Sequence, residues 1–362
     1  MNEKNMPLYW ENHLKEKINR IHELQAQGGK NSVSVGFISD VHWRTNLLGS
    51  VGALERVLFA CSIPYYFNGG DTVSGCGLCE KQFLFDELND YRKAYQAIEH
   101  KCLIVEGNHD RAYSTFEAPT YYAQNMSFNE IYEHMFRPQT QYPDRVMSEN
   151  GRYYYADDKH SKVRFIALNS QDTPNDDVDE EGKIIHNGML NFGFMQEQLD
   201  WLANVALDVP DKSWSVILCS HACPVYGFNE CWEKEKHYNY ALATGILNAF
   251  RKHTSFKGEL THPDAAFDAK VDCDFTGKGG NVIVWLGGHT HRDRLKEVDG
   301  IMCMEIDTDS MQSAGRSEYD RVECSYRTNA IDILTVHPHE HKVFVTRVGA
   351  GPDREFTYEV FE

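Results

Sequence analysis

Hydrophobic and polar positions along the chain follow two different periods, which predicts a mixture of helices and strands. Apolar residues recur at helical spacing in residues 10–24, 83–98 and 194–207. Short β-branched or aromatic runs predict strands in residues 33–39, 65–68, 102–105, 163–169, 215–220 and 282–286. Strands that alternate with helices indicate an α/β fold in which helices pack on sheets.

After residue 300 the pattern changes to strands without intervening helices, in residues 301–306, 330–336 and 342–348. We expect these strands to form a second, mostly antiparallel sheet packed on the first. Because no linker rich in Pro, Gly or Ser interrupts the chain, residues 31–362 are expected to form one domain. An amphipathic helix within residues 1–30 would pack on its body.

Two long stretches, residues 111–149 and 222–275, lack clear periodicity and carry many aromatic residues. Loops of this length inside a compact domain are often functional. We therefore expect lid-like insertions near both stretches. Ordinary surface loops with small hydrophobic clusters are the alternative interpretation.

Five of the expected strands end in residue types that bind metals. In open α/β sheets, ligands gather beyond the carboxyl ends of the strands. The segments that follow these strands are Asp40-Val41-His42, Gly69-Gly70-Asp71, Gly107-Asn108-His109-Asp110, His221 and Gly287-Gly288-His289-Thr290-His291. A single histidine after a strand is usually structural, but five such segments in succession are not expected by chance.

The spacing within these segments also suits metal binding. Glycine allows a backbone that leaves a strand to turn with positive φ and with no Cβ in the way. In an extended segment, D-x-H and H-x-H would each place two side chains on the same side. Aspartates, histidines and one asparagine suit Mn, Fe, Zn or Co better than Mg or Ca. The candidate ligands are too many for one tetrahedral ion, so two ions that share a carboxylate would use them best.

The ordered set D-x-H, G-D, G-N-H-D, H and G-H-x-H resembles the calcineurin-like metallophosphoesterase superfamily. The motifs extend from Asp40 to His291 and therefore cover most of the chain. The resemblance implies a four-layered α/β/β/α sandwich of the metallo-dependent phosphatase type, with its site at the strand ends. It also implies two divalent or trivalent transition metal ions, such as Mn, Fe or Zn.

The resemblance further implies a role for each residue of the motifs. Asp71 would bridge the two ions. One ion would be bound by Asp40, His42 and His291, and the other by Asn108, His221 and His289. His109 would act as general acid, with Asp110 orienting its ring. Arg44 and Arg111 lie next to ligand motifs and are candidates to contact a substrate phosphate, although each also fits a surface salt bridge.

The activity that the resemblance implies is hydrolysis of a phosphomonoester or phosphodiester by a hydroxide held between the two ions. After Asp71 the chain continues Thr72-Val73-Ser74, without the Asp-Arg-Gly of the protein serine/threonine phosphatases. Ser74 also stands where purple acid phosphatases have an iron-binding Tyr. The sequence thus resembles the broad bacterial phosphodiesterase and phosphomonoesterase branches.

The charge balance narrows the class of substrate. With 36 Lys and Arg against 54 Asp and Glu, the formal net charge is −18. Such a balance argues against a general binder of nucleic acid or of anionic membranes, since both need a basic footprint. A small phosphoester is the expected substrate. A nuclease of the same fold, with a local basic groove, is one alternative; a non-catalytic scaffold is another, but it predicts eroded ligands.

The amino terminus is charged and lacks the apolar core of a signal peptide, and no later apolar run is long enough to span a bilayer. Cys102, Cys219 and Cys303 lie in apolar runs, where free buried thiols are expected. We therefore expect a cytoplasmic protein with no membrane partner. The sequence gives no indication of the oligomeric state.

Overall fold

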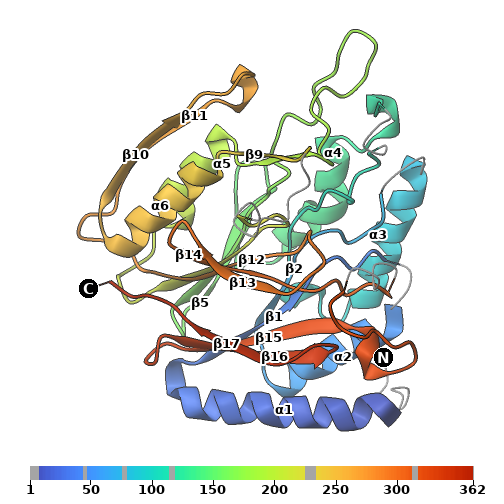
Figure 1. The fold of residues 1–362 in the computed structure, drawn as a ribbon, viewed down its shortest axis with the longest axis vertical. Helices are drawn as coiled ribbons and strands as arrows, with labels where there is room; N and C mark the ends of the chain where they lie inside the picture. The colour runs from blue at the N-terminus through green and yellow to red at the C-terminus, as the bar shows by residue number, and fades with distance from the viewer. Residues whose placement is uncertain are drawn as a thin grey trace.

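Two stacked β-sheets with helices on their outer faces form the centre of the chain in the computed structural model (Figure 1). The structure describes residues 8–43, 47–75, 80–113, 119–224, 234–311 and 317–361. Apolar side chains of both sheets meet between them; the ring centroids of Phe67 and Phe165, one from each sheet, are 6.2 Å apart. The main hydrophobic core therefore includes the interface between the sheets.

Sheet one has the strand order β17-β16-β15-β1-β2-β3. Strands β1, β2 and β3 are parallel, whereas β15 is antiparallel to β1. Their bounds are β1 (Val33–Ile38), β2 (Tyr65–Asn68), β3 (Cys102–Ile104), β15 (Ala330–His337), β16 (Lys342–Gly349) and β17 (Arg354–Thr357).

Sheet two has the strand order β13-β14-β12-β8-β6-β5-β4. Its central strands β14, β12, β8 and β6 are parallel. The bounds are β4 (Arg145–Met147), β5 (Tyr154–Asp158), β6 (Val163–Ala167), β8 (Ser215–Cys219), β12 (Asn281–Gly287), β13 (Arg294–Val298) and β14 (Ile301–Glu305).

The strands after residue 300 correct one expectation. They do not form a sheet of their own: β14 joins sheet two, and β15, β16 and β17 extend sheet one. Every residue of β15 is buried, which requires cover on both faces of that strand. Pairing with β1, in which Val35 lies opposite Leu334, places β15 inside sheet one, where both of its faces are covered.

Helices cover the outer face of each sheet, which confirms the four-layered α/β/β/α sandwich. Helices α1 (Leu8–Gly28), α2 (Leu47–Ala60) and α3 (Lys81–Tyr95) contribute to the core cluster that contains sheet one. Helices α5 (Gln196–Trp201), η7 (Leu202–Ala206) and α6 (Tyr240–Lys252) form a second cluster on sheet two. Within the described part of the chain, no helix is long and apolar enough to cross a membrane.

The stretches 111–149 and 222–275 contain more regular structure than their pattern indicated. In the second stretch, α6 packs Leu242, Ile246 and Phe250 into the core at helical spacing. The periodic signal was present there but was obscured by the surrounding aromatic residues. Also in these stretches are the short helices η4 (Tyr122–Gln124), α4 (Phe128–Ile131), η5 (Tyr132–Phe136), η6 (Arg137–Gln141) and η9 (Ala265–Phe267), and the hairpin of β10 (Ser255–Leu260) and β11 (Ala269–Asp274).

The remaining elements are short. A two-stranded parallel ribbon joins β7 (Asn191–Gly193) to β9 (Lys236–Tyr238). The short helices are η2 (Gly29–Asn31), η3 (Glu99–Lys101) and η11 (Tyr326–Thr328).

Candidate metal centre

The carboxyl ends of five strands meet at one edge of the sandwich and bring the predicted ligands together. Strands β1, β2 and β3 deliver residues from sheet one, and β8 and β12 from sheet two. One group of donor atoms, all within 4.8 Å of one another and all on buried residues, comes from Asp40, His42, Asp71 and His291. Within this group, His291 Nε2 lies 3.0 Å from Asp40 Oδ1 and 3.4 Å from His42 Nε2.

A second group of donor atoms lies on the other side of Asp71. The Asn108 Oδ1 atom is 2.9 Å from His221 Nε2 and 3.0 Å from His289 Nδ1. His221 Nε2 is in turn 3.3 Å from Asp71 Oδ2. The seven candidate residues therefore lie in two neighbouring groups, and Asp71 adjoins both.

One oxygen of Asp71 has a geometry that a cation would satisfy. Its Oδ2 atom is buried and has no hydrogen-bond partner, although His42 Nε2 is 3.8 Å away and His221 Nε2 is 3.3 Å away. A buried carboxylate oxygen without a donor is costly. Metal–ligand bonds of about 2.0 to 2.2 Å place neighbouring ligands about 3 to 3.5 Å apart, close to these separations. The donor set fits two ions that share Asp71.

Hydrogen bonds on the far side of two imidazoles direct their free nitrogens into the centre. His221 Nδ1 donates to the carbonyl oxygen of Gly69 at 2.8 Å, which leaves Nε2 for the ligand position. His289 Nε2 lies 3.2 Å from Glu235 Oε1 and donates to it, which leaves Nδ1 facing Asn108. Such partners fix the tautomer and the ring orientation of metal-binding histidines.

The backbone at the ligands differs from the extended segments that we expected. Five ligands have positive φ angles: Asp40 at 54°, His42 at 41°, Asp71 at 50°, His289 at 73° and His291 at 58°. The D-x-H and H-x-H pairs therefore converge through left-handed turns and not through the alternation of a strand. For residues other than glycine this conformation is strained, and such strain is common at functional sites.

Two glycines of the motifs allow the backbone to approach the aspartates closely. A Cβ on Gly107 would lie 2.2 Å from Asp71 Oδ1, and one on Gly288 would lie 2.3 Å from Asp40 Oδ2 and 1.9 Å from Ser39 Oγ. No side chain fits at either position. Glycine is required at these two positions because a Cβ would collide with the aspartates. The positive φ angles that we expected of the glycines occur mainly at the candidate ligands.

The charges of the ligands compensate one another. Burial raises the pKa of Asp40, but the charge and hydrogen bond of His291 outweigh it and hold that pKa at about 2. Burial lowers the pKa of His42 to about 3, so this imidazole is neutral and one of its ring nitrogens has a lone pair. Burial alone would lower the pKa of His221, but the charge and hydrogen bond of Asp71, with smaller effects of other neighbours, together outweigh burial. The pKa of His221 therefore rises from 6.5 to about 10. A cation that binds here replaces the His221 proton, since metal ligands must be deprotonated.

His109 lies beside the ligands, but Asp110 does not have its expected role. The rings of His109 and His42 meet edge to face with centroids 5.1 Å apart, and the buried His109 Nδ1 has no hydrogen-bond partner. The Asp110 carboxylate instead accepts backbone N–H groups from Thr72 at 2.8 Å, Val73 at 3.1 Å and Gly107 at 2.7 Å. It therefore joins the loops after β2 and β3 and does not orient the His109 ring.

The two candidate phosphate contacts have different outcomes. Arg44 lies outside the residues that the structure describes. The Arg111 side chain is fully buried, with Nε 2.6 Å from Glu106 Oε1 and Nη1 3.1 Å from Asp176 Oδ1. These ion pairs correct the expectation for Arg111, because a guanidinium enclosed in this way is not accessible to a substrate phosphate.

Two residues next to the ligands were not indicated by the sequence. Glu235 contacts His289, and the thioether of Met189 accepts a hydrogen bond from Asn108 Nδ2 at 2.9 Å. Neither residue lies in one of the five segments that follow the strands and carry the candidate ligands. Their positions depend on how the chain folds back over the centre, which no local spacing reports.

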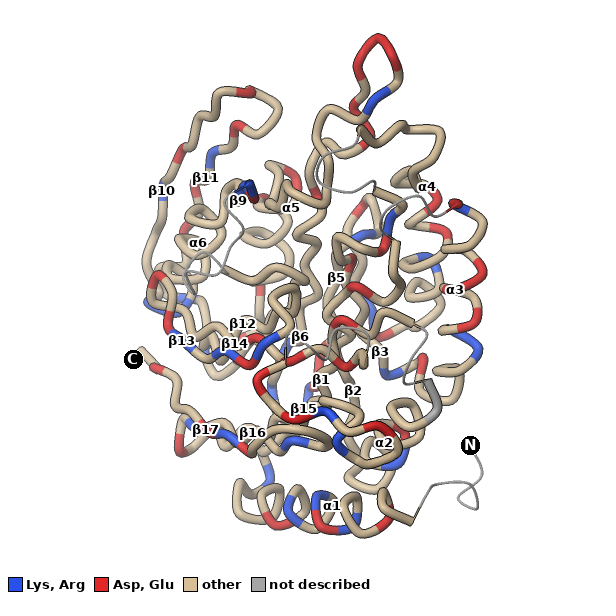
Figure 2. Tube along the Cα trace, turned by 45° about the vertical axis from the view of Figure 1, so that its right-hand side comes forward, with Lys and Arg blue, Asp and Glu red and all other residues tan. Residues whose placement is uncertain are grey.

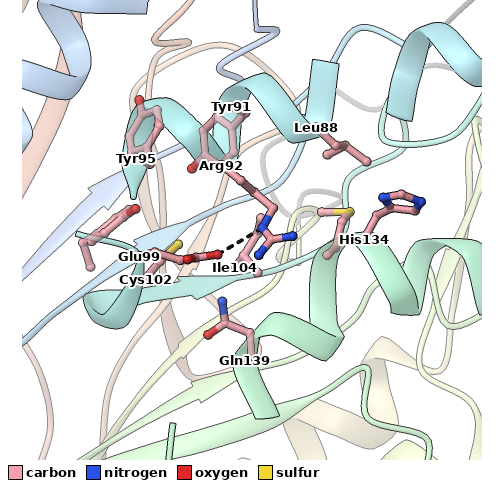
Figure 3. Close-up of a pocket in the computed structure, with 11 residues that line it drawn as sticks. Leu88, Tyr91, Arg92, Tyr95, Glu99, Cys102, Ile104, His134 and Gln139 are labelled. Atoms are coloured by element: carbon pink, nitrogen blue, oxygen red, sulfur yellow. Dashed lines mark hydrogen bonds and ion pairs between the residues drawn. The ribbon is translucent and has the colours of Figure 1, made fainter. Parts of the chain in front are cut away.

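A cavity elsewhere in the molecule is too small to be a substrate site. It lies between α3, β3 and the helices η5 and η6, and the ion pair of Arg92 with Glu99 crosses its wall (Figure 3). Its volume of about 20 Å³ has room for about one water molecule.

On the wall of this cavity, the hydroxyl of Tyr91 accepts a hydrogen bond from Asn68 at 2.8 Å, and Asn68 Oδ1 accepts from the Gly70 backbone at 3.2 Å. The residues around this cavity thus support the turn that carries Asp71.

Residues that could hold metal ions converge at the strand ends of this α/β/β/α sandwich. The family model described as calcineurin-like phosphoesterase matches residues 33–293, and the chain belongs to this family. Family membership and the donor cluster together support metal-dependent hydrolysis of a phosphoester. No curated protein matches the chain in sequence.

Solved structures with a similar fold are distant in sequence. The structure titled GAP50, the anchor in the inner membrane complex of Plasmodium, is 9% identical with a TM-score of 0.47, covering 91% of this chain and 90% of that one. The NAD nucleotidase of Haemophilus influenzae is 12% identical with a TM-score of 0.40, covering 90% and 50%. A 5'-nucleotidase precursor from Thermus thermophilus is 11% identical with a TM-score of 0.36, covering 91% and 54%. Similarity at this level does not contribute to the assignment of a substrate.

Proposed function

We propose that the protein hydrolyses a small phosphomonoester or phosphodiester with two transition metal ions, Mn, Fe or Zn. Asp40, His42 and His291 hold one ion, and Asp71 bridges it to the other. The second ion is held by Asn108, His221 and His289. The observation that carries this proposal is the position of Asp71 Oδ2. This atom is buried between the two groups of donors, has no hydrogen-bond partner, and faces His42 Nε2 and His221 Nε2 at 3.8 and 3.3 Å.

When bound, two ions in such a site lower the pKa of a water molecule and offset the charge that builds on the phosphate oxygens. His109 is the candidate general acid, because its ring adjoins the ligands and its Nδ1 has no other partner. Burial lowers the pKa of this imidazole. A dianionic or monoanionic substrate beside the ring would raise that pKa and favour the protonated form that donates to the leaving group.

The distribution of charge favours a small substrate over a nucleic acid. Acidic residues colour the tip of the loop that projects at the top of Figure 2, where Asp177, Asp179, Glu180 and Glu181 are exposed. A nucleic acid would need a basic surface to neutralise its phosphates. With a net charge of −18, the protein relies on its bound cations to attract an anionic ester.

We further propose that residues 31–362 form one domain with the helix of residues 1–30 packed on it, and that the stretches near 111–149 and 222–275 act as lids. Support comes from Glu235, which belongs to the second stretch and contacts the ligand His289. A cytoplasmic location is part of the proposal. The buried free thiols of Cys102, Cys219 and Cys303 are consistent with a reducing compartment.

The proposal is tested by metal analysis combined with a comparison of substrates. The protein is freed of metal with a chelator, reloaded with Mn²⁺, Fe²⁺ or Zn²⁺, and analysed for metal content. Each form is then incubated with an aryl phosphomonoester, an aryl phosphodiester, and single- and double-stranded DNA. We expect two ions per chain and hydrolysis of an aryl ester with little cleavage of DNA. Two bound ions with no hydrolysis would indicate the scaffold, and preferential cleavage of DNA would indicate the nuclease.

A further inference from the structure

The ribbon of β7 and β9 borders the metal centre from outside the five strand-end motifs. Its two strands run parallel, with Phe192 opposite His237 in the register. In Figure 1 the ribbon strand β9 is labelled between α5 and α4. Because β7 follows Met189 and β9 follows Glu235, the ribbon fixes the positions of both residues relative to the sandwich.

Three contacts join this region to ligands of the second metal position. Glu235, whose side chain is 3% exposed, accepts a hydrogen bond from His289 Nε2 at 3.2 Å. The ring of Phe192 packs against that of His289 with centroids 4.7 Å apart. Met189 Sδ accepts from Asn108 Nδ2 at 2.9 Å.

The second carboxylate oxygen of Glu235 faces the ribbon. Its other oxygen, Oε2, lies 3.6 Å from His237 Nε2, and the His237 ring stacks on Phe192 with an interplanar angle of 12°. The carboxylate therefore has one oxygen toward the ribbon and one toward the ligand His289. This arrangement limits the freedom of His289 to rotate.

The first metal position has different supports. The Asp40 carboxylate accepts the backbone N–H of His289 at 3.1 Å, and the His42 backbone N–H donates to the Asp71 carbonyl at 3.0 Å. Both supports come from the strand-end loops. Across the described ranges, the hydrogen bonds, ion pairs and ring contacts of Asp40, His42 and His291 do not involve the ribbon.

We propose that Glu235 and Met189 are positioning residues that set the metal affinity of the second position without setting that of the first. The inference rests on the proposed dinuclear function. A carboxylate that accepts the far N–H of a ligating histidine fixes its ring and makes its other nitrogen a better ligand. A thioether that accepts the amide N–H₂ of Asn108 keeps the amide oxygen turned toward the ligands, since only that oxygen can bind a cation.

The test is a Mn²⁺ titration of the metal-free protein. Calorimetry measures the two binding events, and electron paramagnetic resonance distinguishes a coupled pair of ions from an isolated ion. We expect Glu235→Ala to weaken the second binding event by about 10- to 100-fold and to leave the first unchanged. Glu235→Gln, which retains an acceptor oxygen, should restore most of the affinity. Met189→Leu should weaken the same event.

Matched controls separate this effect from general damage. Glu259→Ala, an exposed change on β10, and Met302→Leu, at the partly buried position of β14, should bind both ions as the wild type does. In His221→Ala, which lacks a ligand of the second position, adding Glu235→Ala should cause no further loss. Thermal melting with chelator verifies that each variant folds.

The outcomes distinguish this inference from the function on which it rests. If the wild type binds two ions and Glu235→Ala binds them with unchanged affinities, or with both weakened equally, the inference is wrong and the dinuclear function stands. If the wild type itself binds fewer than two ions, the dinuclear function fails and the inference fails with it.

Discussion

The backbone N–H of His109 donates a 2.7 Å hydrogen bond to Oδ1 of Asp71. This bond joins the loop after β3 to the loop after β2. It also makes the two oxygens of the Asp71 carboxylate different. Oδ1 is held by the protein, while Oδ2 has no hydrogen-bond partner. The general acid candidate and the bridging ligand are thus fixed relative to each other by the backbone.

Asp71→Asn should reduce the metal content from two ions per chain to less than one. The change keeps the size of the side chain but removes the negative charge that both cations share, and its amide nitrogen cannot act as a ligand. Elemental analysis after metal loading and desalting gives the measurement. Asp90→Asn, an exposed change on α3, is the matched control and should retain both ions. Two full ions in Asp71→Asn would contradict the bridging role.

His109→Ala should retain both ions but lose most of its rate on alkyl esters. Protonation of a poor alkoxide leaving group typically contributes about 10²- to 10⁴-fold to the rate. An aryl phosphate has a better leaving group that hardly needs the proton, so its rate should fall much less. The measurement is kcat on a matched pair of alkyl and aryl esters. Equal losses on both would show that His109 is not the general acid.

The location of the candidate centre could be predicted from the sequence because each candidate ligand directly follows a strand-like apolar run. Apolar runs mark β1, β2, β3, β8 and β12, and the carboxyl ends of parallel strands lie at one edge of a sheet. A ligand directly after each run therefore comes to the same place. The same kind of run located the central strands of both sheets, and their alternation with helices indicated α/β layering. The outer strands β4, β5, β13 and β17 and the hairpin of β10 and β11 were not predicted.

The parts that could not be predicted depend on contacts between distant segments. The burial of β15 on both faces follows from its neighbours in space, and its sequence alone did not indicate which sheet it joins. Arg111 looked accessible beside a ligand motif, but Glu106 and Asp176 enclose it. Glu235 reaches His289 across 54 residues of chain. No periodicity or short motif carries such information.

The left-handed backbone at His42 leads to a prediction about stability. In metal-free protein, His42→Gly should be more stable than His42→Ala by about 1 kcal/mol, because a Cβ in this conformation costs about 1 to 2 kcal/mol and glycine has none. Both variants lose the same imidazole, so the comparison isolates the backbone. Urea unfolding in the presence of a chelator gives the difference. An alanine variant as stable as the glycine variant would show that φ at this residue, 41°, is not strained.

Arg111→Met tests whether this arginine is structural. The change leaves Glu106 buried without its ion pair, which typically destabilises a protein by about 3 to 5 kcal/mol. Glu106→Gln combined with Arg111→Met should recover part of that loss. For the folded fraction, KM for a phosphoester should stay at the wild-type value. A KM that rises several-fold with unchanged stability would instead make Arg111 a phosphate contact.

A hydrogen bond from β16 to His13 of α1 depends on the protonation state of the His13 ring. Its Nε2 accepts the backbone N–H of Gly349 at 3.0 Å, and its ring stacks on Tyr326 with centroids 4.0 Å apart. Burial lowers the pKa of this imidazole from 6.5 to about 4. The hydrogen bond requires an unprotonated Nε2, so α1 packs on β16 through the neutral form of His13.

The sign of the pH effect follows from this lowered pKa. Below pH 6.5 the unfolded chain binds a proton at His13 that the folded chain binds only near pH 4. The free energy of unfolding should therefore decrease by about 2 kcal/mol through His13 as the pH falls across that window, allowing for partial screening by solvent. His13→Gln should be less stable at neutral pH and show a smaller decrease, whereas His160→Gln, at an exposed histidine, should behave as the wild type. Urea unfolding of the three proteins at successive pH values, with chelator present, measures the difference, and parallel curves for His13→Gln and wild type would refute the coupling.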